Sequence, residues 1–300
     1  MKTSNKFYYF SIISIFTITL SLVIGLFSPS QVKSHLKQMK DDAFQGAQPI
    51  IPTLEVKHAF STSKLNQSIH YQQEIIREKA EHGQAIKELQ QKNKVIYLTF
   101  DDGPSAYSEQ MLDILNKYDA KATFFMIGPN IQSYPAVVKR MADEGFGIGM
   151  HSMTHDAHQV YSSATSPLDE MLEESHIIQG ITGIEPLLIR LPYGSVPYLT
   201  VDMRYYLNEN NFKIWDWNID SEDWKLMDQR YVTKVIQDIK SLEQSGEAPI
   251  VLLHDKQHTV QHLSKLLQYL KKEGYQMKVL TEELVPYTFQ CEGRCYSINE

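Results

Sequence analysis

The chain has 300 residues, of which 42% are hydrophobic, and its formal net charge is −7 at pH 7. This length and apolar content suffice for one domain of roughly 200 residues with a buried core, plus segments outside it. The acidic balance and the lack of a Lys/Arg cluster argue against nucleic acid as a partner, because phosphate binding requires a basic surface. Nothing in the sequence indicates the oligomeric state.

Residues 7–27 contain no charged side chain, and Lys2 and Lys6 precede them. At about 1.5 Å per residue, a helix of this length crosses a hydrocarbon core of roughly 30 Å. The preceding lysines predict that residues 1–6 are cytoplasmic and that the rest of the chain lies outside the cell. A cleaved signal peptide is the alternative, but the apolar run is longer than usual and Ser28-Pro29-Ser30 is a poor cleavage site. We therefore expect a single-pass membrane anchor.

Residues 28–93 are polar and contain no dense apolar run. Within them, Ser68–Gln90 is rich in helix-forming residues and in charged side chains spaced four apart. We expect this part of the chain to be a partly helical stalk between the membrane and a later domain.

From Lys94 to residue 286, short apolar runs alternate with segments of helical periodicity. Repeated β-α units predict a mainly parallel sheet with helices outside it, and seven strands are enough for a closed or nearly closed (β/α)7 barrel. An open, doubly wound sheet is the alternative. The seven expected strands are Val95–Phe100, Ala122–Ile127, Phe146–Met150, Leu187–Arg190, Phe212–Trp217, Ile250–His254 and Gln276–Val279.

The first expected strand ends in Asp101-Asp102-Gly103-Pro104. Neighbouring residues of an extended strand point to opposite faces, so Asp101 and Asp102 should differ in role: one can bind a cation while the other stays free. Taken alone, the same four residues are also typical of a simple turn.

Polar motifs also lie at the ends of four of the other six expected strands, and in a barrel the carboxyl ends of parallel strands share one mouth. These motifs are HSMTH at 151–155, RLPYG at 190–194, DSEDW at 220–224 and HD at 254–255. The spacing of His151 and His155 would place both imidazoles on one side of a helical turn. Together with one acid of the first motif they predict a divalent cation site with open positions. Zinc is our first choice, although Co²⁺, Ni²⁺ and Fe²⁺ accept the same ligands.

Several side chains near this mouth have two interpretations. Arg190 is either a structural ion pair or the cation that holds the free aspartate charged and oriented. Tyr193 and Trp224 suit packing at the rim or contact with a sugar ring. His254 is either a buried structural histidine or a general acid.

Cys291 and Cys295 are the two cysteines of the chain. In an oxidising exterior they could close a small disulfide within a C-terminal tail, residues 287–300. Two free thiols are the alternative, and half of a zinc site is disfavoured because no second ligand pair is near in sequence.

The five motifs, in this order, resemble the polysaccharide deacetylase (NodB-homology) family, carbohydrate esterase family 4. The matching residues are TFDDGPS at 99–105, HSMTH at 151–155, RLPYG at 190–194, DSEDW at 220–224 and LLHD at 252–255. The resemblance implies a distorted (β/α)7 barrel and metal-dependent removal of acetyl groups from polysaccharides. It also implies roles for residues: Asp101 as general base, His254 as general acid, and Asp102, His151 and His155 as metal ligands.

The same resemblance implies that Arg190 steadies Asp101 and that Asp223 tunes His254, with Asp220 as a second candidate. It further implies that the Tyr193 backbone N–H stabilises an oxyanion and that Trp224 and Leu252 line the acetyl pocket.

An anchored domain outside the cell can reach the cell wall, so we expect N-acetylglucosamine of peptidoglycan as the substrate. N-acetylmuramic acid, chitin fragments, biofilm poly-N-acetylglucosamine and acetylated xylan are the alternatives among substrates. A membrane-anchored glycan-binding module without catalysis is the alternative among functions.

Overall fold

The computed structural model describes residues 70, 71, 73, 75–85, 94–243 and 245–299. Residues 75–85 are helical and lie inside the helix expected for the stalk. The anchor expected at residues 7–27 lies outside the described residues, as does most of the stalk. Among the helices that are described, none has both the length and the apolar character needed to cross a bilayer.

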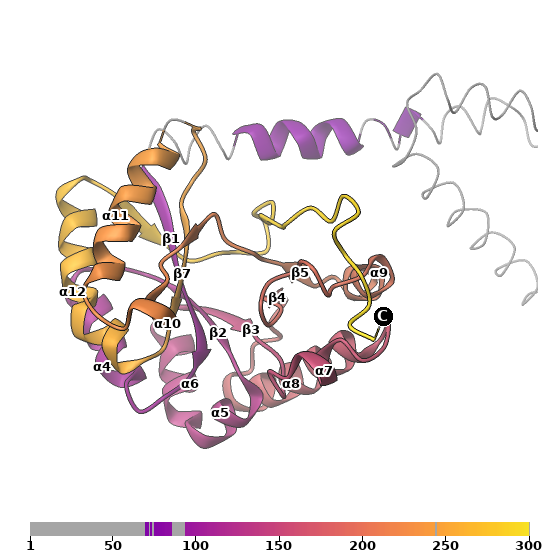
Figure 1. Cartoon of the computed structure of the whole chain (residues 1–300), viewed down its shortest axis with the longest axis horizontal. Coiled ribbons are helices and arrows are strands. Elements are labelled where there is room, and N and C mark those ends of the chain that lie inside the picture. The colour runs from indigo at the N-terminus through magenta and orange to yellow at the C-terminus, as the bar shows by residue number, and fades with distance from the viewer. Residues whose placement is uncertain (1–69, 72, 74, 86–93, 244, 300) are drawn as a thin grey trace, which may run out of the picture. The chain divides into compact units, whose positions relative to one another are not determined.

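Eight strands form one parallel sheet within the described residues (Figure 1). Their order in the sheet is β5-β4-β3-β2-β1-β7-β6, and β8 pairs with the first residues of β1. The strands are β1 Val95–Gly103, β2 Thr123–Met126, β3 Gly147–Met150, β4 Leu188–Ile189, β5 Lys213–Ile214, β6 Ile219–Asp220, β7 Ile250–His254 and β8 Gln276–Lys278.

This strand order distinguishes between the two architectures that the sequence left open. Successive strands are neighbours from β1 to β5, and β7 pairs with β1, so the sheet has no central reversal of order as in a doubly wound sheet. Strands β5 and β6 lie at opposite ends of the order, although only four residues separate them in the chain. The arrangement fits a distorted (β/α)7 barrel.

Each of the seven expected strands overlaps an observed strand, although β1 continues three residues beyond its expected end, and the expectation missed β6. The run Phe212–Trp217 shortens to β5, and β6 follows without a helix between them. The strands were located by the helical segments between them, and no helix separates β5 from β6. Asn218, just before β6, is also a residue type typical of loops. Its side chain instead accepts from the Ile250 backbone N–H at 2.7 Å and donates to the Ala248 carbonyl at 3.0 Å, which holds this segment beside β7.

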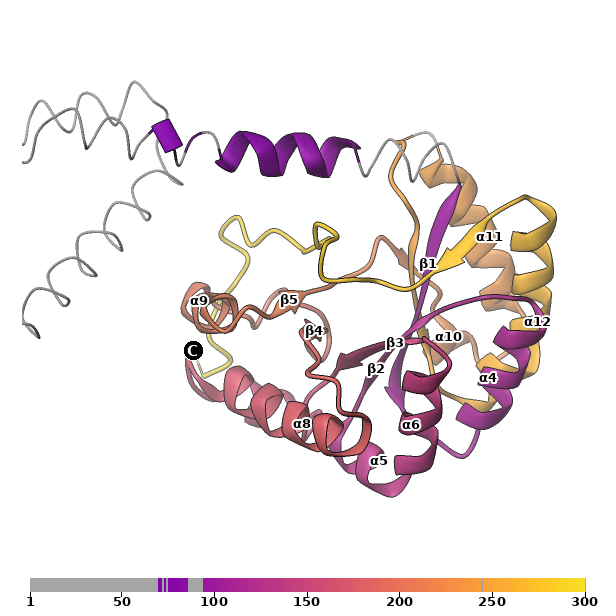
Figure 2. The same ribbon diagram turned by 180° about the vertical axis from the view of Figure 1, so that it is seen from behind.

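Amphipathic helices cover the outer face of the sheet (Figures 1 and 2). In α11, for example, the buried residues Tyr231, Val232, Val235 and Ile239 recur at helical spacing. The helices of the domain are α4 Ser108–Lys117, α5 Gly128–Ser133, α6 Pro135–Asp143, α7 Ala157–Val160, α8 Ser166–Thr182, α9 Val201–Glu209, α10 Asp223–Leu226, α11 Arg230–Leu242 and α12 Gln257–Lys272.

Strand β1 shows how alternation divides the interior into two parts. Ile96, Leu98 and Phe100 belong to the large core shared with the helices, whereas Val95 and Tyr97 belong to a smaller core inside the barrel. Continuing the inner set along the strand gives Thr99 and Asp101, both buried. The inner face of one strand therefore changes from apolar to polar as it approaches the mouth of the barrel.

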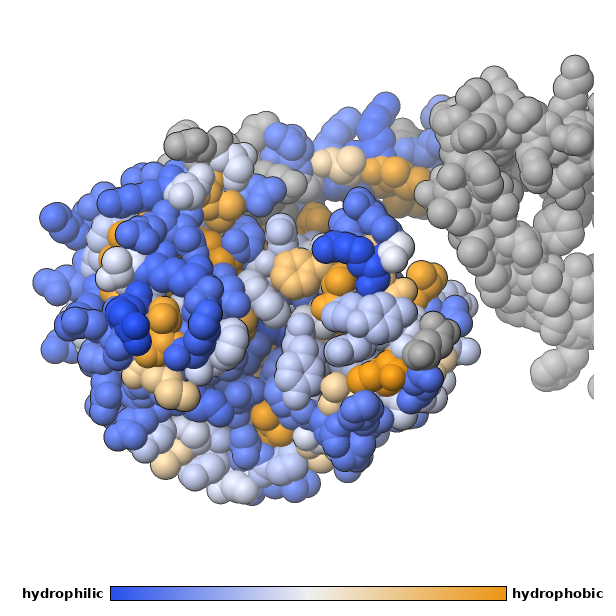
Figure 3. Space-filling model, in the orientation of Figure 1, coloured by the Kyte–Doolittle hydropathy of each residue, from blue (hydrophilic) through white to orange (hydrophobic). Residues whose placement is uncertain are grey.

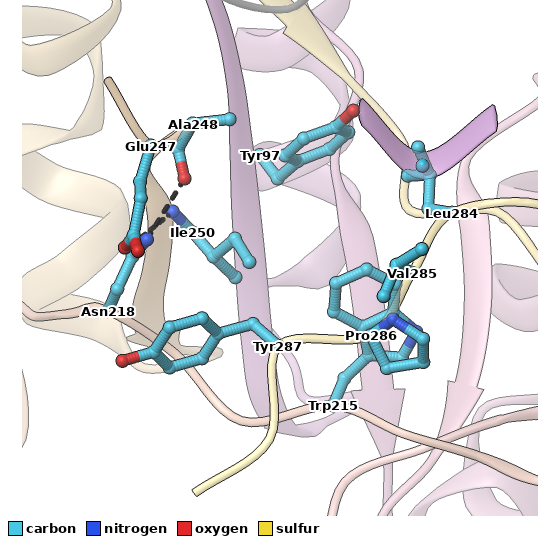
Figure 4. A pocket seen from close by; sticks show the side chains of 11 residues that line it. Tyr97, Trp215, Asn218, Glu247, Ala248, Ile250, Leu284, Val285, Pro286 and Tyr287 are labelled. Atoms are coloured by element: carbon cyan, nitrogen blue, oxygen red, sulfur yellow. Dashed lines mark hydrogen bonds between the residues drawn. The ribbon is translucent and has the colours of Figure 1, made fainter. Parts of the chain in front are cut away.

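A cavity of about 120 Å³ lies at the other end of the barrel (Figure 4). Its walls include Tyr97 and Ile250, which precede Asp101 and His254 by four residues on their strands. Trp215 also lines it, and the indole N–H of this residue has no hydrogen-bond partner within the described part of the chain. The outer surface seen in Figure 3 is mostly hydrophilic, with small, separate apolar patches.

The segment after Pro286 is held against the domain by both backbone and side chains. Tyr287 accepts from the Asp216 backbone N–H at 2.8 Å, and Tyr296 donates its backbone N–H to Pro197 at 3.0 Å. Cys291 and Cys295 form a disulfide, so the alternative of two free thiols is wrong.

Gly149 of β3 creates the space for an aromatic ring that supports the site. A Cβ atom added at Gly149 would lie 2.5 Å from the ring of Phe125 on β2. The Arg190 guanidinium packs over the face of that ring, and its central carbon lies 4.3 Å from the ring centroid. A glycine in mid-strand thus permits a cation–π contact behind the mouth.

We predict that Gly149→Ala lowers the free energy of unfolding by about 1–3 kcal/mol, because the added methyl group forces Phe125 to move in a packed interior. The matched control is Gly180→Ala in α8, where an added Cβ meets nothing within 4 Å. That change should raise the free energy of unfolding by about 0.4–1 kcal/mol. Urea unfolding of the chain without residues 1–27 measures both values, and equal effects would refute the packing argument.

Candidate active site and metal site

Strands β1 and β7 bring the first and last motifs side by side. Asp101 is the register partner of His254, and the Asp255 backbone N–H donates to the Asp101 carbonyl at 2.9 Å. The buried carboxylate of Asp255 accepts from the hydroxyls of Ser105 and Ser108, the Ser105 contact being 2.7 Å long. The two motifs therefore form one hydrogen-bonded unit at the mouth of the barrel.

Asp101 and Asp102 both face this mouth, so the expectation that their side chains diverge is wrong. The register between β1 and β2 shifts between Asp101 and Gly103, and Asp102 has a left-handed backbone with φ of 70°. The bulge cancels the alternation of an extended strand. One oxygen of each carboxylate consequently lies within 4 Å of His151 Nε2: Asp101 Oδ2 at 3.7 Å and Asp102 Oδ1 at 3.8 Å.

Asp102, His151 and His155 converge, as the sequence predicted, but no helical turn presents the two histidines. Residues 151–156 form a loop in which Ser152 and His155 have positive φ, and the two rings lie 4.9 Å apart. Glu170 of α8 holds this loop by accepting from the backbone N–H groups of Met153 and Thr154 at 3.0 and 3.1 Å. One potential ligand atom from each of the three residues lies within 4.8 Å of the others.

The surroundings of His151 fix which ring nitrogen faces the site. Its Nδ1 lies 2.7 Å from the Arg190 carbonyl oxygen, which can only accept, so Nδ1 carries a proton and Nε2 is the nitrogen that faces the site. Behind the loop, the fully buried Glu174 accepts from the His151 backbone N–H at 3.3 Å. Burial raises the pKa of Glu174 well above its ordinary value.

The protonation states of the two other residues also suit a cation. Burial alone would raise the pKa of Asp102, but His151, His254, Lys256 and His155 outweigh it and lower that pKa. Burial, assisted by the neighbouring His151, lowers the pKa of His155. An ionised carboxylate and neutral imidazoles are the forms that bind a metal, so the donor set fits a divalent ion such as zinc.

Arg190 and Asp101 form the buried ion pair that the sequence suggested. Arg190 Nη1 donates to Asp101 Oδ1 at 2.8 Å and to Thr99 Oγ1 at 2.6 Å, and the arginine is completely buried. Its remaining donors go to the backbone carbonyls of Trp215 and Asp216, both at 3.1 Å. Because Arg190 holds Oδ1 of Asp101, the other oxygen is the one that faces His151 in the candidate metal site.

Asp223, rather than Asp220, is the partner of His254. His254 Nδ1 lies 2.7 Å from Asp223 Oδ1, while Asp223 Oδ2 accepts from the His254 backbone N–H at 2.9 Å and from Thr259 Oγ1 at 2.6 Å. Asp220 accepts from the Glu222 backbone N–H at 2.8 Å and thereby shapes the turn before α10.

This pairing favours the protonated form of His254. Burial lowers the pKa of His254, but the hydrogen bond and the charge of Asp223, with Asp101 and Asp102, raise it above the ordinary value overall. For Asp223, burial is likewise opposed by the bonds from His254 and Thr259, and its pKa is lowered.

Tyr193, Trp224 and Leu252 occupy the rim and wall of the mouth. Tyr193 is 59% exposed, has φ of 66°, and donates its hydroxyl to the His155 carbonyl at 3.2 Å. Trp224 is 51% exposed and follows Asp223 in α10. Leu252 is buried on the inner face of β7, two residues before His254. Exposed aromatic rings beside a polar mouth suit contact with a sugar ring.

Two residues beside the site, Lys256 and Asp216, were not predicted from the sequence. Lys256 places Nζ 3.1 Å from Asp102 Oδ2. The fully buried carboxylate of Asp216 accepts from Ser195 and Phe289 backbone N–H groups at 2.9 and 2.6 Å, and so ties the loop after Tyr193 to the C-terminal segment. No local pattern signals either contact, because the partners of both residues are distant in sequence.

Comparison with known proteins identifies relatives of this site and fold. The polysaccharide deacetylase family matches residues 88–215. The chain is 44% identical over 207 residues to YheN of Bacillus subtilis, which is named as a polysaccharide deacetylase, and the match covers 67% of this chain and 73% of YheN. It is 40% identical over 193 residues to a peptidoglycan-N-acetylglucosamine deacetylase of Bacillus cereus, a match that covers 63% of this chain and 70% of that protein.

Solved structures agree with this result. A polysaccharide deacetylase of Bacillus cereus superimposes with a TM-score of 0.61 at 38% identity, covering 67% of this chain and 98% of that one. The catalytic domain of a peptidoglycan N-acetylglucosamine deacetylase from Eubacterium rectale gives the same TM-score at 31% identity and covers 67% and 94%. With its five motifs gathered at the mouth of one distorted barrel, the chain belongs to the polysaccharide deacetylase family.

Proposed function

We propose that this polysaccharide deacetylase is an extracellular, metal-dependent enzyme that removes the N-acetyl group from N-acetylglucosamine of peptidoglycan. The observation that carries the proposal is the joint arrangement of three groups: the Asp102–His151–His155 cluster, Asp101 held by Arg190, and His254 held by Asp223. They provide a cation site, a base and an acid within one mouth. Several relatives are named as deacetylases of this sugar in peptidoglycan.

Asp102, His151 and His155 would hold the divalent metal, with zinc as our first choice and Co²⁺, Ni²⁺ or Fe²⁺ as alternatives. Such an ion, when bound, polarises a carbonyl oxygen and makes water more acidic at neutral pH. Three protein ligands leave positions for water and substrate.

The chain's own residues supply the proton transfers. Asp101 takes a proton from the attacking water through Oδ2, since Arg190 occupies Oδ1. The backbone N–H of Tyr193 stabilises the negative oxygen that develops on the acetyl carbonyl. His254, with Nδ1 bound to Asp223, gives the Nε2 proton to the leaving amine. Acetate and a free amino sugar result, and Trp224 and Leu252 would enclose the acetyl group.

The paired base and acid argue against a binding module without catalysis. Asp101 and His254 are each buried or nearly so, and each is held by a charged partner. Burying charged groups costs several kcal/mol per ion. A surface that only recognises glycans has no use for that arrangement.

The extracellular location is part of the proposal. Residues 7–27 have the length and composition of a membrane anchor, and Lys2 and Lys6 favour a cytoplasmic N-terminus. The disulfide Cys291–Cys295 supports an oxidising compartment. Cell-wall polysaccharide is then the substrate within reach of the domain.

The function is tested by acetate release from peptidoglycan, chitin oligosaccharides and acetylated xylan, measured in parallel. We expect release from peptidoglycan, loss of activity after chelation and recovery with Zn²⁺ or Co²⁺, because the ion polarises the carbonyl. Identification of the deacetylated sugar distinguishes N-acetylglucosamine from N-acetylmuramic acid. Full activity in a metal-free preparation would contradict metal dependence, and release from xylan alone would contradict the substrate.

The pH profile tests the roles of His254 and Asp223. If protonated His254 is the acid, activity falls as pH rises through the pKa of His254. Because this pKa is raised, activity persists to higher pH than an ordinary histidine would allow. Asp223→Asn removes the charge that raises this pKa, so the falling limb should move to lower pH and kcat/KM above pH 7 should drop by about 10²-fold or more. Asp220→Asn in the same motif is the control. An unmoved limb in Asp223→Asn would refute the assignment.

The membrane anchor is tested by fractionation of intact cells. We expect the full-length chain in the membrane fraction, with protease added outside cutting between residues 28 and 93, because that stretch lacks the apolar density for compact folding. A mature protein that begins near Ser30 and is found in the medium would replace the anchor with a cleaved signal peptide. That result would leave the extracellular assignment intact.

A further inference from the structure

Lys256 and the two histidines contact different oxygens of the Asp102 carboxylate. Its Nζ lies 3.1 Å from Asp102 Oδ2. The other oxygen, Oδ1, lies 3.4 Å from His155 Nε2 and 3.8 Å from His151 Nε2. One oxygen of the expected metal ligand therefore faces the other ligands, and the second is already held by a lysine.

The backbone around Lys256 is fixed by the same contacts that place the catalytic motifs. The residue before it, Asp255, donates its backbone N–H to the Asp101 carbonyl and is bound by Ser105 and Ser108. The residue after it begins α12, and the Lys256 carbonyl accepts the Val260 backbone N–H at 3.1 Å. The side chain thus extends from an immobilised position toward a fixed carboxylate.

We propose that Lys256 is a positioning residue. It restricts Asp102 to one metal-binding oxygen and lowers the affinity of the site for its metal. The inference rests on the metal site of the proposed function. A carboxylate that binds through both oxygens occupies two positions around the ion, and a salt bridge to Oδ2 prevents this. The lysine charge also opposes a nearby divalent ion and withdraws charge from its ligand.

Binding through one oxygen and a lower metal affinity both favour a site that is open to substrate over one that binds its metal as tightly as possible. A single carboxylate oxygen with two imidazoles leaves positions for water and the acetyl oxygen. The Lys256 side chain is 46% exposed and that of Asp102 is 19% exposed, so the pair itself stabilises the fold little. Its consequence lies in the metal site rather than in stability.

The test compares Lys256→Gln and Lys256→Arg with the wild type in the full-length protein in detergent, with Co²⁺ as the probe. Titration calorimetry gives the dissociation constant, and visible absorption reports the coordination number, because four-coordinate Co²⁺ absorbs more strongly than five- or six-coordinate Co²⁺. The matched control is Lys271→Gln, which removes one positive charge from a half-exposed lysine near the end of α12, paired with Asp119 at 3.6 Å.

We expect Lys256→Gln to bind Co²⁺ about tenfold more tightly, as loss of one opposing charge near the ion implies, and to absorb less strongly because Asp102 takes a second position. Lys256→Arg and Lys271→Gln should behave like the wild type. Affinity in Lys256→Gln that is equal to or weaker than wild type overturns this inference alone. Absence of Co²⁺ binding in the wild type overturns the inference together with the metal site of the proposed function.

Discussion

The buried ion pair between Arg190 and Asp101 is the interaction on which the rest of the site depends. Arg190 is completely buried, and its guanidinium contacts β1 through Asp101 and Thr99 and the chain after β5 through the carbonyls of Trp215 and Asp216. Its own carbonyl holds the ring of His151. Removing one partner of such a pair typically costs about 3–5 kcal/mol, because the other charge stays buried without compensation. One residue thus contributes to the stability of the barrel interior and orients both the proposed base and a proposed metal ligand.

A hydrogen bond at Nδ1 orients both His151 and His254, but the charge of the partner differs between them. In each, Nδ1 is occupied, by the Arg190 carbonyl for His151 and by the Asp223 carboxylate for His254, so Nε2 faces the mouth. A neutral carbonyl partner leaves the first ring suited to a cation, whereas an anionic partner favours the protonated form of the second. The proposed roles of ligand for His151 and acid for His254 therefore follow from the charge of the group behind each ring.

The sequence predicted those parts of the structure that local pattern determines. Alternation and helical periodicity located the seven expected strands, and the rule that motifs gather at the carboxyl ends of parallel strands predicted the joint position of Asp102, His151 and His155. The family resemblance favoured Asp223 over Asp220 as the partner of His254, but local pattern does not separate the two acids. Only the contact of Asp223 with His254 in space distinguishes them.

The remaining differences arise from backbone geometry and from contacts distant in sequence. The bulge at Asp102 and the positive φ of His155 replace the flat strand and the helical turn that the spacing suggested. Lys256 and Asp216 act on partners that are distant along the chain, and a lone lysine or aspartate gives no local signal of this. The stretch after Pro286 was expected only as a tail, because its partners are distant in sequence: Tyr287 packs on the smaller core, Phe289 contacts Trp217, and Tyr296 contacts Tyr198.

The central claim is that two adjacent carboxylates have separate tasks, Asp101 in proton transfer and Asp102 in metal binding. The most direct measurement is metal content determined beside the rate of acetate release in Asp101→Asn and Asp102→Asn. The account predicts that Asp101→Asn keeps its metal and loses turnover by about 10²-fold or more, whereas Asp102→Asn loses both. Loss of metal from Asp101→Asn with retention in Asp102→Asn would contradict it, because the two roles would then be exchanged.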